Sequence, residues 1–153
     1  MKIRQILSKE CVLASLNSKT KEEVIVELSA LLAEHHKNLA TDQIVQVLTE
    51  REKLGSTGIG NGVAIPHGKL TNIEQIVTAF GRSLDGIAFD SQDGKPAHLF
   101  FVLLAPENAA SLHLKALARL SRLLKDVNFR NKLIEAKTQD EIYQEIVSED
   151  EKF

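Results

Sequence analysis

The sequence predicts an α/β fold in which helices cover the faces of a sheet. Residues 97–105 read Ala-His-Leu-Phe-Phe-Val-Leu-Leu-Ala, a run that is apolar on both faces, as a central strand would be. Leucine and alanine then recur at helical spacing over residues 110–124, which indicates a helix with one apolar face. Since strands and helices alternate along the chain, the helices should pack on the sheet.

The first half of the chain is predicted to contain three helices and one strand. Apolar residues at helical spacing give the second helix one buried face, and Thr20 and Glu23 have the spacing of a capping box at its start. Gly55 can end the third helix. The predicted elements are a short helix at 3–7, a strand at 11–16, a helix from Ser18 or Thr20 to about residue 36, and a helix from 41 to about 51.

The second half is predicted to hold three strands followed by three helices. Pro106 breaks the central strand, and Thr138 and Glu141 have capping-box spacing at the start of the last helix. The predicted elements are a strand at 63–65, a turn at 66–69, a strand at 75–84 that ends at the turn pair Asp85-Gly86, the central strand at 97–105, and helices at 110–124, 128–136 and 139–147.

The bulk composition is that of one globular domain. The chain has 153 residues, with 43% hydrophobic and 26% charged residues, and we expect a single domain over residues 1–153 because no linker, repeat or low-complexity stretch divides it. The net charge of −2 lacks the basic excess typical of nucleic-acid binding. The N-terminus mixes charges into its apolar positions, so we expect no membrane insertion and a cytoplasmic location. Cys11, the only cysteine, is given no role.

Residues 55–62 form a glycine-rich segment that could hold a phosphate, because backbone N–H groups approach an anion closely where side chains are absent. The segment lacks the Lys-Ser or Lys-Thr of a P-loop and the third glycine of a dinucleotide-binding motif. A tight connection between a helix and a strand explains the same glycines, so their density alone leaves both interpretations open.

His67 is the sharper feature, since it follows Pro66 and precedes Gly68 at the end of a short predicted strand. A single histidine in such a turn is often structural or merely exposed. His113 favours a functional interpretation, because it lies in the first turn of the predicted helix at 110–124, where a helix N-terminus favours anions.

Two neutral imidazoles are suited to phosphoryl transfer. One unprotonated ring nitrogen is a nucleophile, and a second imidazole can donate a hydrogen bond to phosphoryl oxygens. Charge stabilisation could come from Arg51 and from the loop, whose candidate phosphoryl-binding residues are Ser56, Thr57, Gly58, Gly60 and Asn61. We expect no metal site, because a third ligand is not visible beside the two histidines.

The run from Arg51 to Lys69, Arg-Glu-Lys-Leu-Gly-Ser-Thr-Gly-Ile-Gly-Asn-Gly-Val-Ala-Ile-Pro-His-Gly-Lys, resembles the EIIA domains of the fructose/mannitol family of the bacterial phosphotransferase system (PTS). Leu112-His113-Leu114 downstream strengthens the resemblance, which covers essentially the whole chain and is nearest to the nitrogen-regulatory branch (EIIA-Ntr). The resemblance implies a mixed β-sheet flanked by helices on both faces.

The resemblance also implies roles for single residues. His67 matches the phosphorylated histidine, His113 the second active-site histidine and Arg51 the arginine that begins the motif. The residues alone leave either ring nitrogen of His67 open as the acceptor, and the expected product is tele-phosphohistidine. Arg51 could act in transfer or in folding. No cofactor is implied.

In such relays the EIIA histidine accepts its phosphoryl group from a histidine phosphocarrier (HPr or NPr), so the resemblance implies a phosphotransferase component with an HPr/NPr-like donor. Members of the nitrogen-regulatory branch control proteins of nitrogen metabolism and potassium transport according to their phosphorylation state. Two alternatives stay open: a free-standing fructose-type EIIA that passes phosphate to a IIB cysteine, and a docking module that is not phosphorylated.

Overall fold

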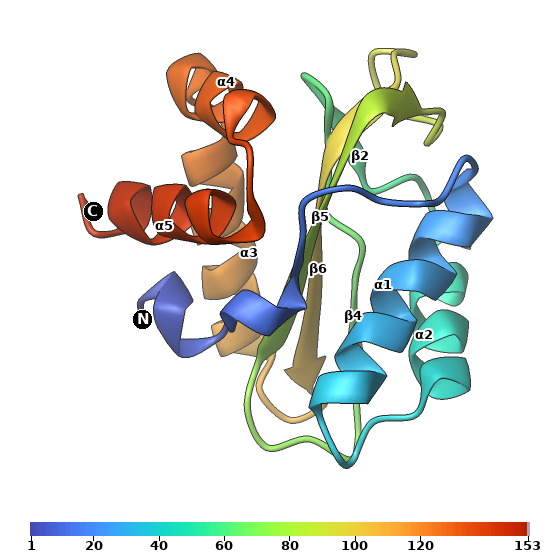
Figure 1. The fold of residues 1–153 in the computed structure, drawn as a ribbon. Helices are drawn as coiled ribbons and strands as arrows, with labels where there is room; N and C mark the ends of the chain where they lie inside the picture. Colours follow the sequence, from blue (N-terminus) through green and yellow to red (C-terminus); the bar gives the residue numbers. More distant parts are fainter. Residues whose placement is uncertain (153) are drawn as a thin grey trace.

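The computed structural model describes residues 1–152, which build one mixed sheet with helices on both faces (Figure 1). The six strands pair in the order β1-β5-β6-β3-β2, and β4 also pairs with β6. Their bounds are β1 Val12–Leu13, β2 Gly58–Gly60, β3 Val63–Ala64, β4 His67–Leu70, β5 Val77–Ile87 and β6 Ala97–Pro106. The predicted fold class is confirmed.

Strand β6 is the centre of the sheet, as its apolar sequence predicts. It pairs with β5 in the antiparallel direction and with β3 and β4 in the parallel direction. Its residues are almost all buried, and Phe80 of β5 contacts Phe101 edge-to-face with ring centroids 5.1 Å apart. Strand β4, which carries His67, and helix α3, which carries His113, therefore both lie next to this central strand.

Five α-helices within residues 1–152 cover the sheet. Figure 1 shows α1 and α2 on one side of it and α3, α4 and α5 on the other. Their bounds are α1 Lys21–His35, α2 Thr41–Lys53, α3 Ala110–Leu124, α4 Val127–Glu135 and α5 Gln139–Asp150. No helix among residues 1–152 is both long enough and apolar enough to cross a membrane.

The predicted capping signals fix the starts of two helices. Thr20 Oγ1 accepts a hydrogen bond from the amide of Glu23 at 3.2 Å, and Thr138 Oγ1 accepts one from the amide of Glu141 at 3.1 Å. Each side chain satisfies a donor that the first turn of a helix leaves without a partner. The two helix starts are therefore confirmed at the positions that the sequence indicates.

Several predicted boundaries are wrong. The helix expected at 3–7 is a 3₁₀ turn over Ile3–Gln5, and a second 3₁₀ turn follows at Lys9–Cys11. The strand expected at 11–16 is only Val12–Leu13. The strand expected to end at the turn pair Asp85-Gly86 continues to Ile87. The pairing register with β6 shifts between Arg82 and Ile87, and this irregularity accommodates the extra residues, with Gly86 at φ 85°.

The segment around His67 also differs from the prediction. Residues 66–69 are not a turn: His67 begins β4, which runs parallel to β6 in register with Leu103. Pro66 lacks an N–H and separates β4 from β3, while its carbonyl still accepts from the amide of Leu103 at 2.9 Å. The glycine-rich segment contains strand β2, which the prediction missed because three residues of Gly-Ile-Gly give no strand pattern.

Candidate active site

The backbone next to His67 fixes its imidazole. Nδ1 of His67 lies 2.8 Å from the carbonyl oxygen of Ile65, two residues earlier, across the break that Pro66 makes in the strand. A carbonyl oxygen can only accept, so Nδ1 carries the proton of this hydrogen bond. In the neutral ring the lone pair is then on Nε2, which leaves that nitrogen as the nucleophile.

His113 meets His67 because both of their elements pack on β6. Strand β4 pairs with β6 at one edge, and α3 begins four residues after β6 ends and packs back on it. The two imidazole rings lie with centroids 5.5 Å apart and their planes at 73°. The side chain of His113 is buried, whereas His67 is half-buried and thus reachable from outside.

Nε2 of His113 is buried and has no hydrogen-bond partner among residues 1–152. Buried polar atoms are normally paired, and an unpaired one costs roughly 1–3 kcal/mol. An orphan of this kind beside a nucleophilic imidazole is suited to bind an atom that is absent from the resting protein, such as the oxygen of a transferred group.

Both imidazoles are disposed to be neutral at neutral pH. Burial is the main cause that lowers the pKa of His67 below its usual value, and the charge of Arg51 lowers this pKa further. The hydrogen bond to Ile65 acts in the opposite direction and raises it. Burial also lowers the pKa of His113, followed by the charges of His67 and Lys69. Neutral rings keep a lone pair available for attack on an electrophile.

Two cations therefore act on the histidine pair. Arg51, near the end of α2, donates from Nη1 to the carbonyl of Gly55 at 2.8 Å and stands close enough to affect His67 electrostatically. Lys69 affects His113 in the same way, and it was not among the candidate residues. It lies two residues after His67 on β4, so the two side chains share a face, but the sequence predicted a turn over residues 66–69 and gave no such signal.

The polar groups of the glycine-rich segment at residues 55–62 form hydrogen bonds that stabilise the conformation of this segment. Ser56 Oγ donates to the carbonyl of Phe89 at 2.6 Å and accepts from the amide of Gly58 at 3.0 Å. Asn61 lies between Gly60 and Gly62, which both have positive φ, and its amide donates to Asp93 Oδ2 at 3.1 Å. Contact of Ser56, Gly58, Gly60 or Asn61 with a phosphoryl group stays a prediction.

Thr57 is buried and bound to Glu52, a residue that the sequence analysis gave no role. The amide of Thr57 donates to both carboxylate oxygens of Glu52, at 3.1 and 3.2 Å, and its hydroxyl donates to Oε2. Glu52 also raises the pKa of His67, in opposition to Arg51. No sequence signal distinguishes Glu52 from the other glutamates of the helix, because its contacts form only in the folded chain.

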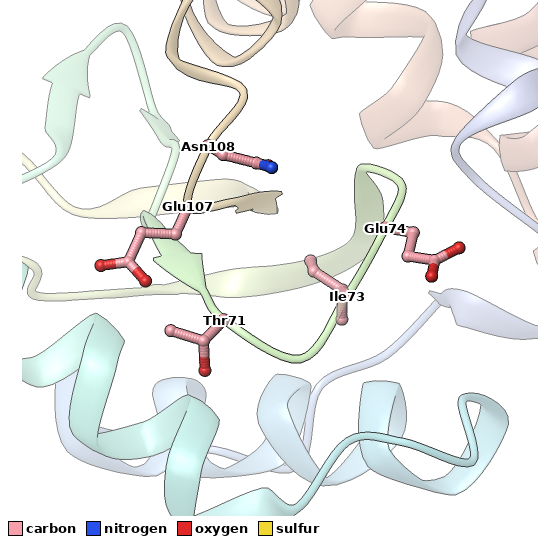
Figure 2. Close-up of a pocket in the computed structure, with 5 residues that line it drawn as sticks. All are labelled: Thr71, Ile73, Glu74, Glu107 and Asn108. Atoms are coloured by element: carbon pink, nitrogen blue, oxygen red, sulfur yellow. The ribbon is translucent and has the colours of Figure 1, made fainter.

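A separate hollow of about 590 Å³ lies beside the loop that follows β4 and the start of the loop before α3 (Figure 2). Its lining includes Glu74 and Glu107, whose carboxylates point away from each other in Figure 2, and it does not include either histidine of the pair. Two carboxylates disfavour an anion, so we assign this hollow no part in phosphoryl chemistry. Among residues 1–152 no group of three His, Cys, Asp or Glu side chains could hold a metal ion.

Comparison with known proteins places this geometry in context. Residues 5–149 match the family model described as "Phosphoenolpyruvate-dependent sugar phosphotransferase system, EIIA 2". A nitrogen regulatory protein of Bradyrhizobium diazoefficiens is 44% identical over 147 residues, which cover 94% of this chain and 93% of that protein. The fructose-specific EIIABC component of Bacillus subtilis is 42% identical over 142 residues, which cover 93% of this chain and only 22% of that longer protein.

The same similarity appears in a solved structure. The nitrogen regulatory protein IIA-Ntr from Neisseria meningitidis superposes on this chain with a TM-score of 0.88 at 35% sequence identity. The superposition covers 94% of this chain and 98% of that one, so the similarity extends over the whole fold rather than over the site alone.

Proposed function

Since the chain belongs to the EIIA type 2 family of the phosphoenolpyruvate-dependent sugar PTS, we propose that it carries a phosphoryl group on Nε2 of His67. The observation that carries this proposal is the bond from Nδ1 of His67 to Ile65, which leaves Nε2 with the lone pair. Phosphorylation at Nε2 gives tele-phosphohistidine, and the bond from Nδ1 to Ile65 is kept in the product.

The transfer is a displacement at phosphorus. The Nε2 lone pair of His67 forms a new N–P bond while the N–P bond to the imidazole of the donor protein breaks. The donor nitrogen keeps that electron pair, and the donor ring, protonated at its other nitrogen, leaves as a neutral imidazole, while the phosphorylated His67 ring keeps its proton on Nδ1. No water or metal takes part in this step. The protein contributes position and charge stabilisation, which are the main requirements of a loose, in-line transition state.

His113 is the proposed stabiliser of the transferred group. Its Nε2 has no partner in the resting protein, and protonated there it can donate to a phosphoryl oxygen. The charges of Arg51 and Lys69, which lower the pKa values of the two imidazoles, favour the same anion. The amides of the glycine-rich loop are the further proposed contacts.

The donor is proposed to be a histidine phosphocarrier of the HPr/NPr type. Large apolar side chains are exposed on the elements that carry the site, namely Leu54 just after α2 and Leu112 and Leu114 on either side of His113. Exposed apolar side chains on the elements that carry reacting groups are typical of a protein-docking face. A protein donor can bury these leucines while it presents its own phosphohistidine to Nε2 of His67.

The proposed output is regulation of partner proteins by phosphorylation state. A phosphoryl group adds roughly 1.5 to 2 negative charges at one point of the docking face, so a partner that binds there can be released without a large movement. Nitrogen regulation is supported by the names of the Bradyrhizobium and Neisseria relatives, which this chain covers over nearly their full length. Control of potassium transport and a cytoplasmic location belong to the same proposal.

A second candidate function is supported by the Bacillus relative, which is named as a fructose-specific component. In that role the protein would pass the phosphoryl group from Nε2 of His67 to a cysteine of a IIB partner. The chemistry at His67 is the same for both candidates. They differ in the acceptor, so incubation of the phosphorylated protein with IIB proteins separates them.

The experiment is intact-mass spectrometry at neutral to alkaline pH after incubation with phosphoenolpyruvate, enzyme I and a histidine phosphocarrier. The wild-type protein should gain one acid-labile phosphoryl group, and His67→Ala should gain none. His98→Ala is the matched control, because His98 is another half-buried histidine whose Nδ1 binds a carbonyl. A wild-type protein that gains no adduct from HPr- and NPr-type carriers would leave the unphosphorylated docking module as the better description.

A further inference from the structure

We propose that Glu52 is a positioning residue for His67, acting through the backbone of the glycine-rich loop. The inference rests on the proposed function, in which Nε2 of His67 is the nucleophile. It adds a specific claim: the carboxylate of Glu52, one helical turn before Gly55, decides which ring nitrogen of His67 faces the donor, although it does not touch the ring.

Glu52 is tightly held and almost inaccessible. Its side chain is 5% exposed and accepts from both the amide and the hydroxyl of Thr57. On its other side it forms an ion pair with Lys21 of α1, with Nζ 3.0 Å from Oε1. A buried carboxylate needs such partners, so all three residues are fixed relative to one another.

Lys21 is itself fixed by the surface on which it packs. Its Nζ lies 4.9 Å above the ring centroid of Phe89 and 3.3 Å from Asp90 Oδ2. The carbonyl of the same Phe89 accepts from Ser56 in the glycine-rich loop. The first helix and the segment before β6 therefore hold the loop at two adjacent residues, Ser56 and Thr57.

A continuous set of hydrogen bonds leads from Glu52 to the imidazole. Thr57 binds Glu52 through its amide, and its carbonyl accepts from the amide of Ile65 at 3.0 Å. The carbonyl of Ile65 then accepts from Nδ1 of His67 at 2.8 Å. The Thr57–Ile65 hydrogen bond orients the backbone at Ile65, and the carbonyl of Ile65 selects the tautomer of His67.

The local sequence favours a role for this anchor. Thr57 is followed directly by Gly58, and Gly55, at φ 146°, lies two residues before it, so the backbone near Thr57 has little steric restriction of its own apart from Ser56. Without Glu52 the peptide group of Thr57 can rotate, and the carbonyl of Thr57, which accepts from the amide of Ile65, moves with it. The carbonyl of Ile65 then no longer has a single orientation. His67 would then exchange its Nδ1–H form with the Nε2–H form, which is not nucleophilic at Nε2.

The test uses the full chain and two readouts. Nitrogen-15 NMR of the histidine rings reports the tautomer of His67 without any donor, and rapid-quench phosphorylation by the phosphorylated carrier reports the transfer rate. In Glu52→Ala we expect a mixture of His67 tautomers and a rate roughly tenfold to a hundredfold lower, as small displacements of a nucleophile cause. In Glu52→Gln, which keeps an oxygen acceptor for Thr57, the loss should be smaller.

Two controls separate positioning from general damage. Glu50→Gln changes an exposed glutamate of the same helix, which accepts from Gln46, and should leave both readouts unchanged. His98 supplies an internal control in every spectrum, since its Nδ1 lies 3.0 Å from the carbonyl of Ser83, to which neither Glu52 nor Thr57 is hydrogen-bonded. Its tautomer should be the same in the wild-type protein and in both Glu52 variants.

The outcomes are separable. A single unchanged tautomer of His67 with an unchanged rate in Glu52→Ala would overturn the inference, and so would an equal change at His98 and His67, because that is general loss of structure. If Glu52→Ala does not fold, Glu52→Gln decides the matter by the same criteria. If the wild-type protein accepts no phosphoryl group, the proposed function fails, while the tautomer of His67 still decides the positioning role of Glu52.

Discussion

Replacement of His113 by leucine should make the resting protein more stable and the proposed phosphoryl transfer much slower. His113 is 6% exposed, and its Nε2 is buried without a partner among the described residues. The orphan costs roughly 1–3 kcal/mol, and leucine fills a similar volume without any polar atom. We therefore expect the free energy of unfolding of His113→Leu to exceed that of the wild type by about 1 kcal/mol, a rise of roughly 2–4 °C in Tm for a domain of this size.

The same substitution removes the proposed donor to the phosphoryl oxygens. Loss of one such preorganised donor slows catalysis by roughly 10²–10³-fold. The two effects have opposite signs, so a simple loss of structure cannot imitate the result. Urea unfolding measures the first effect, and rapid-quench transfer from a phosphorylated carrier measures the second.

The pH dependence gives the stability effect a further signature. Burial holds the pKa of His113 below its usual 6.5, so the unfolded chain binds more protons than the folded one as the pH falls below that value. The cost of His113 to stability is thus smallest above pH 6.5, where the ring is neutral in both states, and grows as the pH falls through the folded pKa. The advantage of His113→Leu over the wild type should grow between pH 7 and pH 5.

His98→Leu is the control for this prediction. It removes a bond to the carbonyl of Ser83, so it should lower stability by about 1 kcal/mol and leave phosphorylation unchanged. A His113→Leu protein that is less stable than the wild type by 2 kcal/mol or more, or that accepts phosphate at the wild-type rate, would refute the assignment of an orphaned donor.

Two further substitutions test the surroundings of His67. Gly68→Ala would place a Cβ 2.3 Å from Cγ1 of Val47, so either the side chain of Val47 or the packing of β4 on α2 must shift. We expect a loss of roughly 1–3 kcal/mol in urea unfolding that is largely recovered in the Gly68→Ala/Val47→Ala double variant; no recovery would show that the contact is not the cause. Arg51→Gln removes a positive charge that lowers the pKa of His67, so that pKa should rise in an NMR titration while transfer slows; a pKa that falls or stays constant would contradict the proximity of Arg51 to the ring.

Local sequence signals were sufficient for much of the fold. The threonines at positions 20 and 138 indicated where α1 and α5 begin, and the apolar run at 97–105 indicated the central strand, β6. These predictions succeeded because a cap bonds only within its own first turn and a strand buried on both faces needs apolar residues at every position. Strand β4 was missed because Pro66 and Gly68 resemble a turn, although a parallel partner holds His67–Leu70 extended.

The residue types that the chemistry needs are visible in the chain alone: a histidine between proline and glycine, a second histidine at a helix start, and an arginine that opens the glycine-rich motif. How these residues act depends on the folded arrangement. The 5.5 Å approach of the two rings and the orphaned Nε2 of His113 depend on how β4 and α3 pack on β6. The bond from Nδ1 of His67 to Ile65 and the bonds of Glu52 to Thr57 are local in sequence but form only in the folded backbone. Distances between segments far apart in the chain are set by packing against a shared strand, and no local pattern encodes them.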